Sequence, residues 1–200
     1  MQQKEYTMLS LGDSYTIGEK ADEADRFPNQ TVMMLHSKGI YFEKPKIIAA
    51  TGWTTDELAS AIQKENLNGN YDFVTLLIGV NNQYRGKDVE NYHKEFIELL
   101  EQSIQFADGK PNHVIVLSVP DWGVTKFAEG RDRNKIASEI DAYNAVNNEE
   151  SEKRKVNYIN ITSFTRQHAD WVMDDGLHPD SKQYELWANE VVKIILNILK

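Results

Sequence analysis

Short, almost uninterrupted apolar runs alternate along this chain with longer amphipathic segments, and this alternation restricts the fold more than any other feature of the sequence. Runs such as KIIAAT and FVTLLIGV are apolar nearly throughout, as expected of strands that are covered on both faces. Strands that alternate with crossover helices are typical of α/β proteins with a mainly parallel sheet. Five strands are expected, at residues 6–12, 46–51, 73–80, 113–119 and 156–161.

The segments between these runs carry the helical period, with apolar side chains recurring at three- and four-residue steps. Thr54 and Glu57 have the spacing of a capping box at the start of one such helix. Asp132 or Asn134 is expected to cap a longer one. Helices are therefore predicted from residue 54 onward, over 88–107, from about 132 to 152 and over about 180–199.

Composition narrows the class of protein. The 200 residues are 40% hydrophobic and show no repeat or linker, so one domain over residues 1–200 is expected. A net charge of −9 repels phosphate backbones, which argues against a nucleic-acid ligand. The absence of cysteine excludes disulfides and thiolate chemistry and fits a reducing compartment. With no apolar window long enough to span a membrane, a cytoplasmic location is expected unless a signal peptide has been removed; the oligomeric state is not indicated.

Three polar or flexible residues directly follow predicted strands, where open α/β sheets bind their ligands. Ser14 follows the first strand, Gly52 the second and Asn81 the third. Each has an ordinary explanation, as a helix cap, a turn glycine and a strand-terminating asparagine. The alternative is a nucleophilic hydroxyl with backbone and amide donors for an oxyanion beside it.

A serine hydroxyl is a poor nucleophile unless a base takes its proton, and a carboxylate best orients that base. His178 suits this task because MDDGLHPD places Asp175 three residues before it in a short loop. Asp180 in the same loop is interpreted as the cap of the last helix. A metal site is the less favoured alternative, since this acidic loop lacks a second nitrogen ligand. Surface or capping positions are expected for the other histidines considered, His36, His93 and His113.

These blocks, taken together and in this order, resemble those of the SGNH (GDSL) hydrolases. The resemblance runs from Leu9 to His178, and its blocks are Gly12-Asp13-Ser14, Gly52, Gly79-Val80-Asn81-Asn82 and Asp175-Gly-Leu-His178. It implies a three-layer α/β/α fold of the flavodoxin type with a five-stranded parallel sheet, in agreement with the strand count. It implies no cofactor, no metal and an ester as the small-molecule substrate.

The resemblance also implies a role for each matching residue. Ser14 would attack an ester carbonyl, His178 would accept its proton and Asp175 would orient the imidazole. The N–H groups of Ser14 and Gly52 and the amide of Asn81 would form the oxyanion hole. Two positions depart from the family pattern. Tyr15 replaces a leucine, and Asn82 replaces an aspartate, which puts in question any hydrogen bond that relies on that carboxylate.

Two other functions compete with ester hydrolysis as explanations of these residues. A phosphate-binding loop fails on spacing, because five residues separate Gly12 from Gly18 and no Gly-Lys-Ser/Thr follows. A catalytically inactive module that binds a glycan or a protein through its loop aromatics is the remaining alternative. Those aromatics are Trp53, Tyr84, Trp122 and Phe127.

The substrate is less constrained than the reaction. Residues 118–127 are expected to form one wall of the substrate pocket, and the polar segment 18–28 a second rim. The resemblance covers lysophospholipases, thioesterases, arylesterases and carbohydrate O-acetylesterases. A small or medium-sized ester is predicted.

Overall fold

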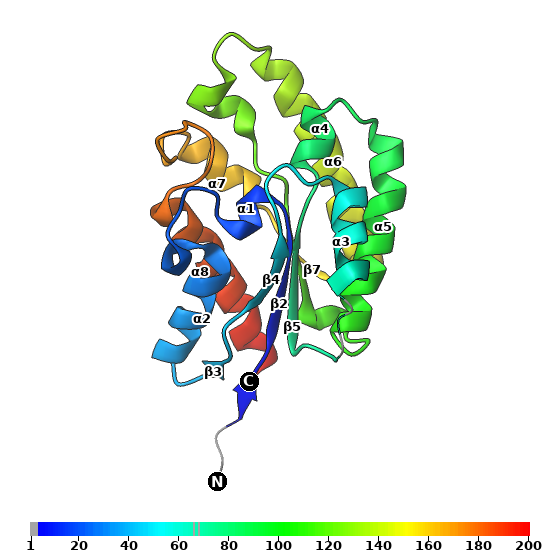
Figure 1. Cartoon of the computed structure of the whole chain (residues 1–200), viewed down its shortest axis with the longest axis vertical. Helices are drawn as coiled ribbons and strands as arrows, with labels where there is room; N and C mark the ends of the chain where they lie inside the picture. The colour runs from blue at the N-terminus through cyan, green and yellow to red at the C-terminus, as the bar shows by residue number, and fades with distance from the viewer. Residues whose placement is uncertain (1–3, 66, 68) are drawn as a thin grey trace.

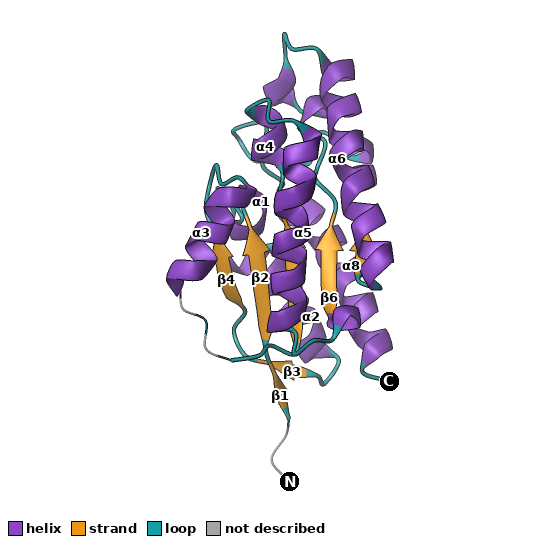
Figure 2. Ribbon diagram, turned by 90° about the vertical axis from the view of Figure 1, so that its right-hand side faces the viewer, coloured by secondary structure: helices purple, strands orange, loops and turns teal. Residues whose placement is uncertain are grey.

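A five-stranded parallel sheet with the strand order β4-β2-β5-β6-β7 forms the centre of the computed structural model, which describes residues 4–65, 67 and 69–200 (Figures 1 and 2). The strands are β2 (Met8–Gly12), β4 (Lys46–Ala49), β5 (Phe73–Leu77), β6 (Val114–Leu117) and β7 (Asn157–Ile159). The chain runs from β2 to one edge of the sheet and then returns past β2 to build the other side. The strand order therefore reverses at β2, and a crevice is expected beyond the carboxyl ends of β2 and β5.

Helices cover both faces of this sheet and complete the predicted α/β/α fold (Figure 1). The helices α1, α2, α7 and α8 lie on one side, and α3, α5 and α6 lie on the other. Their bounds are α1 (Ser14–Ile17), α2 (Phe27–Ser37), α3 (Thr55–Glu65), α4 (Val80–Tyr84), α5 (Val89–Phe106), α6 (Arg133–Arg154), α7 (Thr162–Gln167) and α8 (Ser181–Ile198). No helix in the described ranges is both long and apolar enough to cross a membrane.

The side chains of each strand point alternately to the two faces of the sheet, and the hydrophobic core is therefore divided into two clusters. In β5, Phe73 and Leu77 belong to the cluster that contains the apolar residues of α2 and α8, whereas Val74 and Leu76 belong to the cluster under α3 and α5. Successive side chains of a strand point to opposite faces, so an uninterrupted apolar run supplies both clusters at once. The near-continuous hydrophobicity of the five runs follows from this double coverage.

All five predicted strands are longer than the observed ones, and two of them show a physical reason. The run over residues 6–12 is split at Thr7, whose N–H donates to the Asp72 carboxylate at 2.9 Å. The residues before the split form β1 (Glu5–Tyr6), which pairs with β3 (Tyr41–Phe42) in a separate two-stranded sheet. The run over 73–80 ends at Leu77 because Gly79 has a φ of 129° and the chain then enters α4.

The helix α2 was not predicted; residues 18–28 were expected to form a polar rim, and nothing was assigned to the residues that follow them. Pro28 lies in the first turn of α2, where a missing N–H costs nothing. Phe27 and Leu35 of this helix are fully buried. The predicted long helix begins at its cap Asp132, whose side chain accepts the N–H of Lys135.

Candidate active site

Ser14 lies directly after β2, at the position where the strand order reverses. It begins the short helix α1, and the Asp13 carboxylate accepts the N–H of Tyr15 at 3.0 Å and so fixes the turn. Gly12 permits the close approach of this turn to β5, since a Cβ there would collide with the Leu77 carbonyl and the Thr16 side chain. The Ser14 side chain is therefore presented at the edge of the sheet while the residue remains only 5% exposed.

Asp13 beneath this turn is fully buried. One carboxylate oxygen binds the Tyr15 N–H, and the other has no hydrogen-bond partner among the described residues. Burial raises the pKa of Asp13 to about 7, although the N–H of Tyr15 acts in the opposite direction.

Asp175 and His178 form a hydrogen-bonded pair in the loop between α7 and α8. His178 Nδ1 lies 2.7 Å from Asp175 Oδ2, and Asp175 Oδ1 accepts the N–H groups of Leu177 and His178 at 2.9 and 3.0 Å. Burial opposes the Asp175 charge, but these three bonds outweigh it and lower the pKa of the carboxyl group. Asp175 is consequently an anion at neutral pH, so His178 donates through Nδ1–H and keeps Nε2 free to accept a proton.

The two predicted oxyanion donors outside Ser14 are held by contacts that the sequence did not reveal. Asn81 was expected to end the third strand, but it lies in α4, and its Nδ2 donates to the Trp53 carbonyl at 3.0 Å. Gly52 has a φ of 84°, and its carbonyl accepts from Arg85 at 2.6 Å. In the described part of the chain, no acceptor binds the N–H of Ser14 or Gly52. One hydrogen of the Asn81 amide also remains available.

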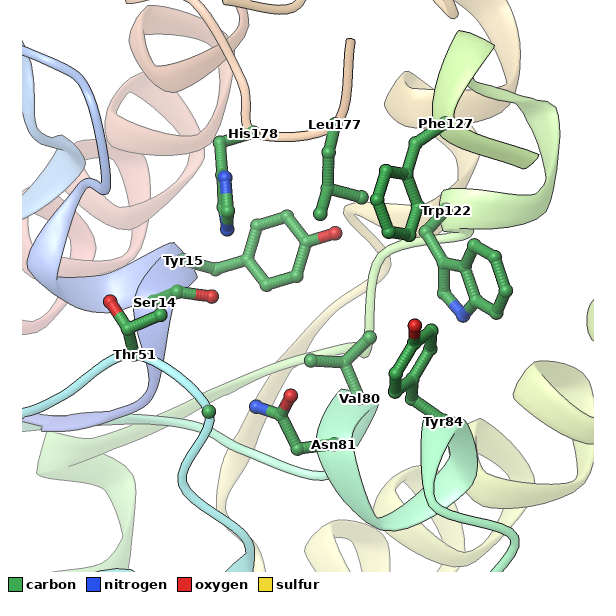
Figure 3. Close-up of a pocket in the computed structure, with 11 residues that line it drawn as sticks. Ser14, Tyr15, Thr51, Val80, Asn81, Tyr84, Trp122, Phe127, Leu177 and His178 are labelled. Carbon is green, nitrogen blue, oxygen red and sulfur yellow. The ribbon is translucent and has the colours of Figure 1, made fainter. Parts of the chain in front are cut away.

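One pocket of about 180 Å³ brings these groups together (Figure 3). Ser14, Gly52, Asn81 and His178 all line it, and Asp175 lies behind His178. Figure 3 shows the imidazole extending from its loop towards Ser14, with Asn81 on the opposite side of the pocket. The other lining residues are Tyr15, Thr51, Val80, Tyr84, Trp122, Phe127 and Leu177.

An aromatic wall formed by Tyr84, Trp122 and Phe127 closes the pocket opposite Ser14. The Arg131 guanidinium lies 5.2 Å from the first two ring centres and 5.3 Å from the third, and it donates to the Tyr84 hydroxyl. Residues 118–127 therefore contribute to the pocket as predicted, through Trp122 and Phe127. The predicted rim over residues 18–28 and the indole of Trp53 are not part of the pocket lining.

Asn82 replaces the family aspartate and supports the site indirectly. Its Oδ1 accepts the N–H of Thr55 at 3.1 Å, and its Nδ2 donates to the Thr55 hydroxyl at 2.6 Å. That hydroxyl in turn donates to the Glu95 carboxylate. The amide thus links α4 to the start of α3, next to the Gly52 loop, and Glu95 supplies a carboxylate that Asn82 lacks.

The remaining candidates have structural roles. Asp180 caps α8 by accepting the N–H groups of Lys182 and Gln183 at 3.0 Å, as predicted. His36 and His113 bind backbone groups near the ends of their elements, and His93 pairs with the buried Glu150 carboxylate. Within the described ranges, no three acidic or histidine side chains gather into a possible metal site.

The α/β fold, together with a family match over residues 10–186, defines a carboxylic ester hydrolase. A family model described as the GDSL-like Lipase/Acylhydrolase family matches residues 10–186, and the chain belongs to this family. No curated protein matches the chain by sequence.

Solved structures share the fold at low sequence identity. Axe2, an acetylxylan esterase from Geobacillus stearothermophilus, superposes with a TM-score of 0.75 at 16% identity, covering 96% of this chain and 95% of that one. A lipase/acylhydrolase from Enterococcus faecalis gives 0.72 at 21% identity, with 95% of each chain covered. The psychrotrophic esterase EstA from Pseudoalteromonas gives 0.72 at 15% identity, with 98% and 99% covered.

Proposed function

We propose that this protein hydrolyses a small or medium-sized carboxylic ester through an acyl-enzyme intermediate on Ser14. The observation that carries the proposal is the convergence of Ser14, the Asp175-bound His178 and free N–H donors on one pocket. Each group supplies what the others lack. The hydroxyl needs a base, the base needs a fixed tautomer, and the developing oxyanion needs donors that are already in place.

In the proposed reaction, Ser14 Oγ attacks the ester carbonyl while His178 Nε2 takes its proton. The resulting imidazolium is stabilised by Asp175 across the 2.7 Å contact. The N–H groups of Ser14 and Gly52 and the second Asn81 amide hydrogen bind the oxyanion. His178 then protonates the departing alcohol, after which it deprotonates a water molecule that attacks the acyl group and releases the acid.

The pocket limits the size of the group next to the scissile bond. A pocket of about 180 Å³ that is bounded by the aromatic wall can hold a short acyl chain or a single ring, but it cannot fully enclose a long alkyl chain. Esters of short acids and acetylated carbohydrates both meet this description.

The test combines activity with covalent labelling. Hydrolysis of 4-nitrophenyl esters from acetate to decanoate is measured for the wild type, for Ser14→Ala and for Ser37→Ala, an exposed serine on α2 that serves as the control. Ser14→Ala is expected to lower kcat by at least about a thousandfold, with Ser37→Ala unchanged. A fluorophosphonate adduct mapped by mass spectrometry should lie on Ser14. Labelling elsewhere, or undiminished hydrolysis by Ser14→Ala, would refute the proposal.

A further inference from the structure

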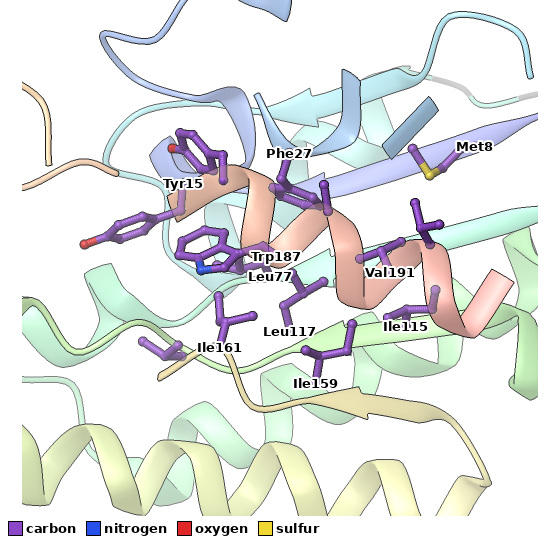
Figure 4. Close-up of a cluster of buried hydrophobic side chains, with 14 of the residues drawn as sticks. Met8, Tyr15, Phe27, Leu77, Ile115, Leu117, Ile159, Ile161, Trp187 and Val191 are labelled. Carbon is purple, nitrogen blue, oxygen red and sulfur yellow. The ribbon is translucent and has the colours of Figure 1, made fainter. Parts of the chain in front are cut away.

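Tyr15, which stands where the family has a leucine, brings a hydroxyl group into the pocket. Its ring packs against Trp187 of α8 at 6.2 Å between centroids (Figure 4) and against His178 at 5.6 Å. The residue is 3% exposed and lines the same pocket as Ser14. Figure 3 shows its hydroxyl directed away from Ser14, towards Leu177 and the aromatic wall. A leucine would fill the inner part of this space but would place no polar atom there.

Apart from the groups assigned to the proposed catalysis, the Tyr15 hydroxyl differs from the other side-chain polar atoms of this pocket because it is unengaged. Trp122 Nε1 donates to Gln83 at 2.7 Å, and the Tyr84 hydroxyl accepts from Arg131. The Thr51 hydroxyl donates to Glu19. Among the described residues, no partner binds the Tyr15 hydroxyl, and it is not one of the sealed, unpartnered atoms of the core. It is therefore an accessible hydrogen-bonding group in an otherwise apolar part of the pocket.

Burial also fixes the protonation state of this phenol. The pKa of Tyr15 is raised by burial first and then by the negative charges of Asp13, Asp175 and Asp121. The group stays neutral at any working pH, so it can both donate and accept a hydrogen bond.

We propose that Tyr15 is a specificity-determining residue that selects esters whose pocket-filling portion carries an oxygen atom within reach of its hydroxyl. This rests on the proposed function, because it concerns the substrate of the same site. A hydroxyl, ether or carbonyl oxygen would replace the water that solvates the phenol. A hydrocarbon chain of the same shape would displace that water and leave the hydroxyl unpaired, which is how polar sites reject apolar analogues.

The test uses two matched pairs of esters. In the acyl pair, 4-nitrophenyl pentanoate is compared with 4-nitrophenyl 3-methoxypropanoate. In the alcohol pair, pentyl acetate is compared with 2-ethoxyethyl acetate. Each pair differs by one methylene exchanged for oxygen, and each rate is divided by that of hydroxide-catalysed hydrolysis. The wild type, Tyr15→Phe and Tyr184→Phe are assayed, since Tyr184 packs on the same Trp187 but its hydroxyl is sealed in the core.

The wild type is expected to favour the oxygenated member of at least one pair by about tenfold in kcat/KM. Tyr15→Phe keeps the ring against His178 and removes the hydroxyl that the hydrocarbon ester would leave unpaired, so it should abolish this preference mainly by raising kcat/KM for the hydrocarbon member. Tyr184→Phe should retain the preference.

Three results would overturn the proposal: no preference in the wild type, an unchanged preference in Tyr15→Phe, or an equal loss on both members of each pair. The last result would indicate that Tyr15 only positions His178. Failure of the proposed function is separable, because it would appear as the absence of Ser14 labelling by a fluorophosphonate, whichever esters are used.

Discussion

The Asn81 side chain is oriented for its proposed role by a hydrogen bond within the protein. Its amide already donates one hydrogen to the Trp53 carbonyl, which fixes the direction of the other. A preorganised donor of this kind strengthens its bond as negative charge develops on the carbonyl oxygen.

Asn81→Ala is therefore expected to lower kcat by roughly two to three orders of magnitude with little change in KM. Steady-state kinetics on the best short-chain ester provide the measurement, and circular dichroism provides the check on folding. A loss confined to KM would show that the amide contributes to ground-state binding and not to the oxyanion hole.

Residue types at the site were predictable, whereas the contacts that hold them were not. Ser14, Gly52 and Asn81 were identified because each follows a strand, and Asp175 and His178 because they share one short loop. Arg85 gave no such signal, since it binds the Gly52 carbonyl from a different element. Backbone carbonyls have no signature in a sequence, and pairing across elements depends on the completed fold.

At the scale of elements, the junction between α4 and α3 connects the fold to the site. Asn82 satisfies both the N–H and the hydroxyl of Thr55 in a buried position, immediately after the Gly52 loop. A buried donor that loses its partner costs its full desolvation penalty, so this contact holds the loop in place.

Asn82→Ala is expected to lower the free energy of unfolding by about 1–3 kcal/mol. Asn82→Asp should fall between this variant and the wild type. A carboxylate still accepts the Thr55 N–H, but it competes with Glu95 for the one hydroxyl hydrogen. Urea unfolding followed by tryptophan fluorescence measures all three proteins. Equal stability of Asn82→Ala and the wild type would show that this contact does not stabilise the junction.

Helices and strands were predicted wherever their periodicity was uninterrupted. The end of β5 was misplaced because the apolar run continues through Ile78 and Val80, which are buried outside the strand. Only the positive φ of Gly79 breaks the strand. A Cβ at position 79 would lie 2.7 Å from the ring of Tyr92, which belongs to α5. This requirement for glycine comes from another element and cannot be read from the local sequence.

At the scale of the whole molecule, the buried Asp13 carboxyl couples global stability to pH. Its pKa is about 7 in the folded protein, against the ordinary value of 3.8 for an exposed aspartate. Between these values the unfolded chain releases a proton that the folded protein retains. Stability contributed by this group is therefore highest below about pH 4 and decreases as the pH rises towards 7.

Asp13→Asn removes this titration while keeping the hydrogen-bond acceptor for Tyr15. The stability of the variant relative to the wild type should increase by about 1 kcal/mol per pH unit between about pH 4 and pH 7. Urea unfolding of both proteins across that range provides the measurement, because the other titrating groups cancel in the difference. A constant difference would mean that Asp13 ionises normally in the folded protein.

The topology of the sheet also has a consequence for the synthesis of this protein. Ser14 follows the first strand of the main sheet, whereas Asp175 and His178 follow the last one. The proposed nucleophile is thus synthesised before its base, which follows every strand of the main sheet. A nascent chain, or a translation product truncated before residue 175, carries the hydroxyl and its oxyanion donors without the group that activates them. If the proposed mechanism holds, hydrolysis requires that the segment carrying Asp175 and His178 has been synthesised.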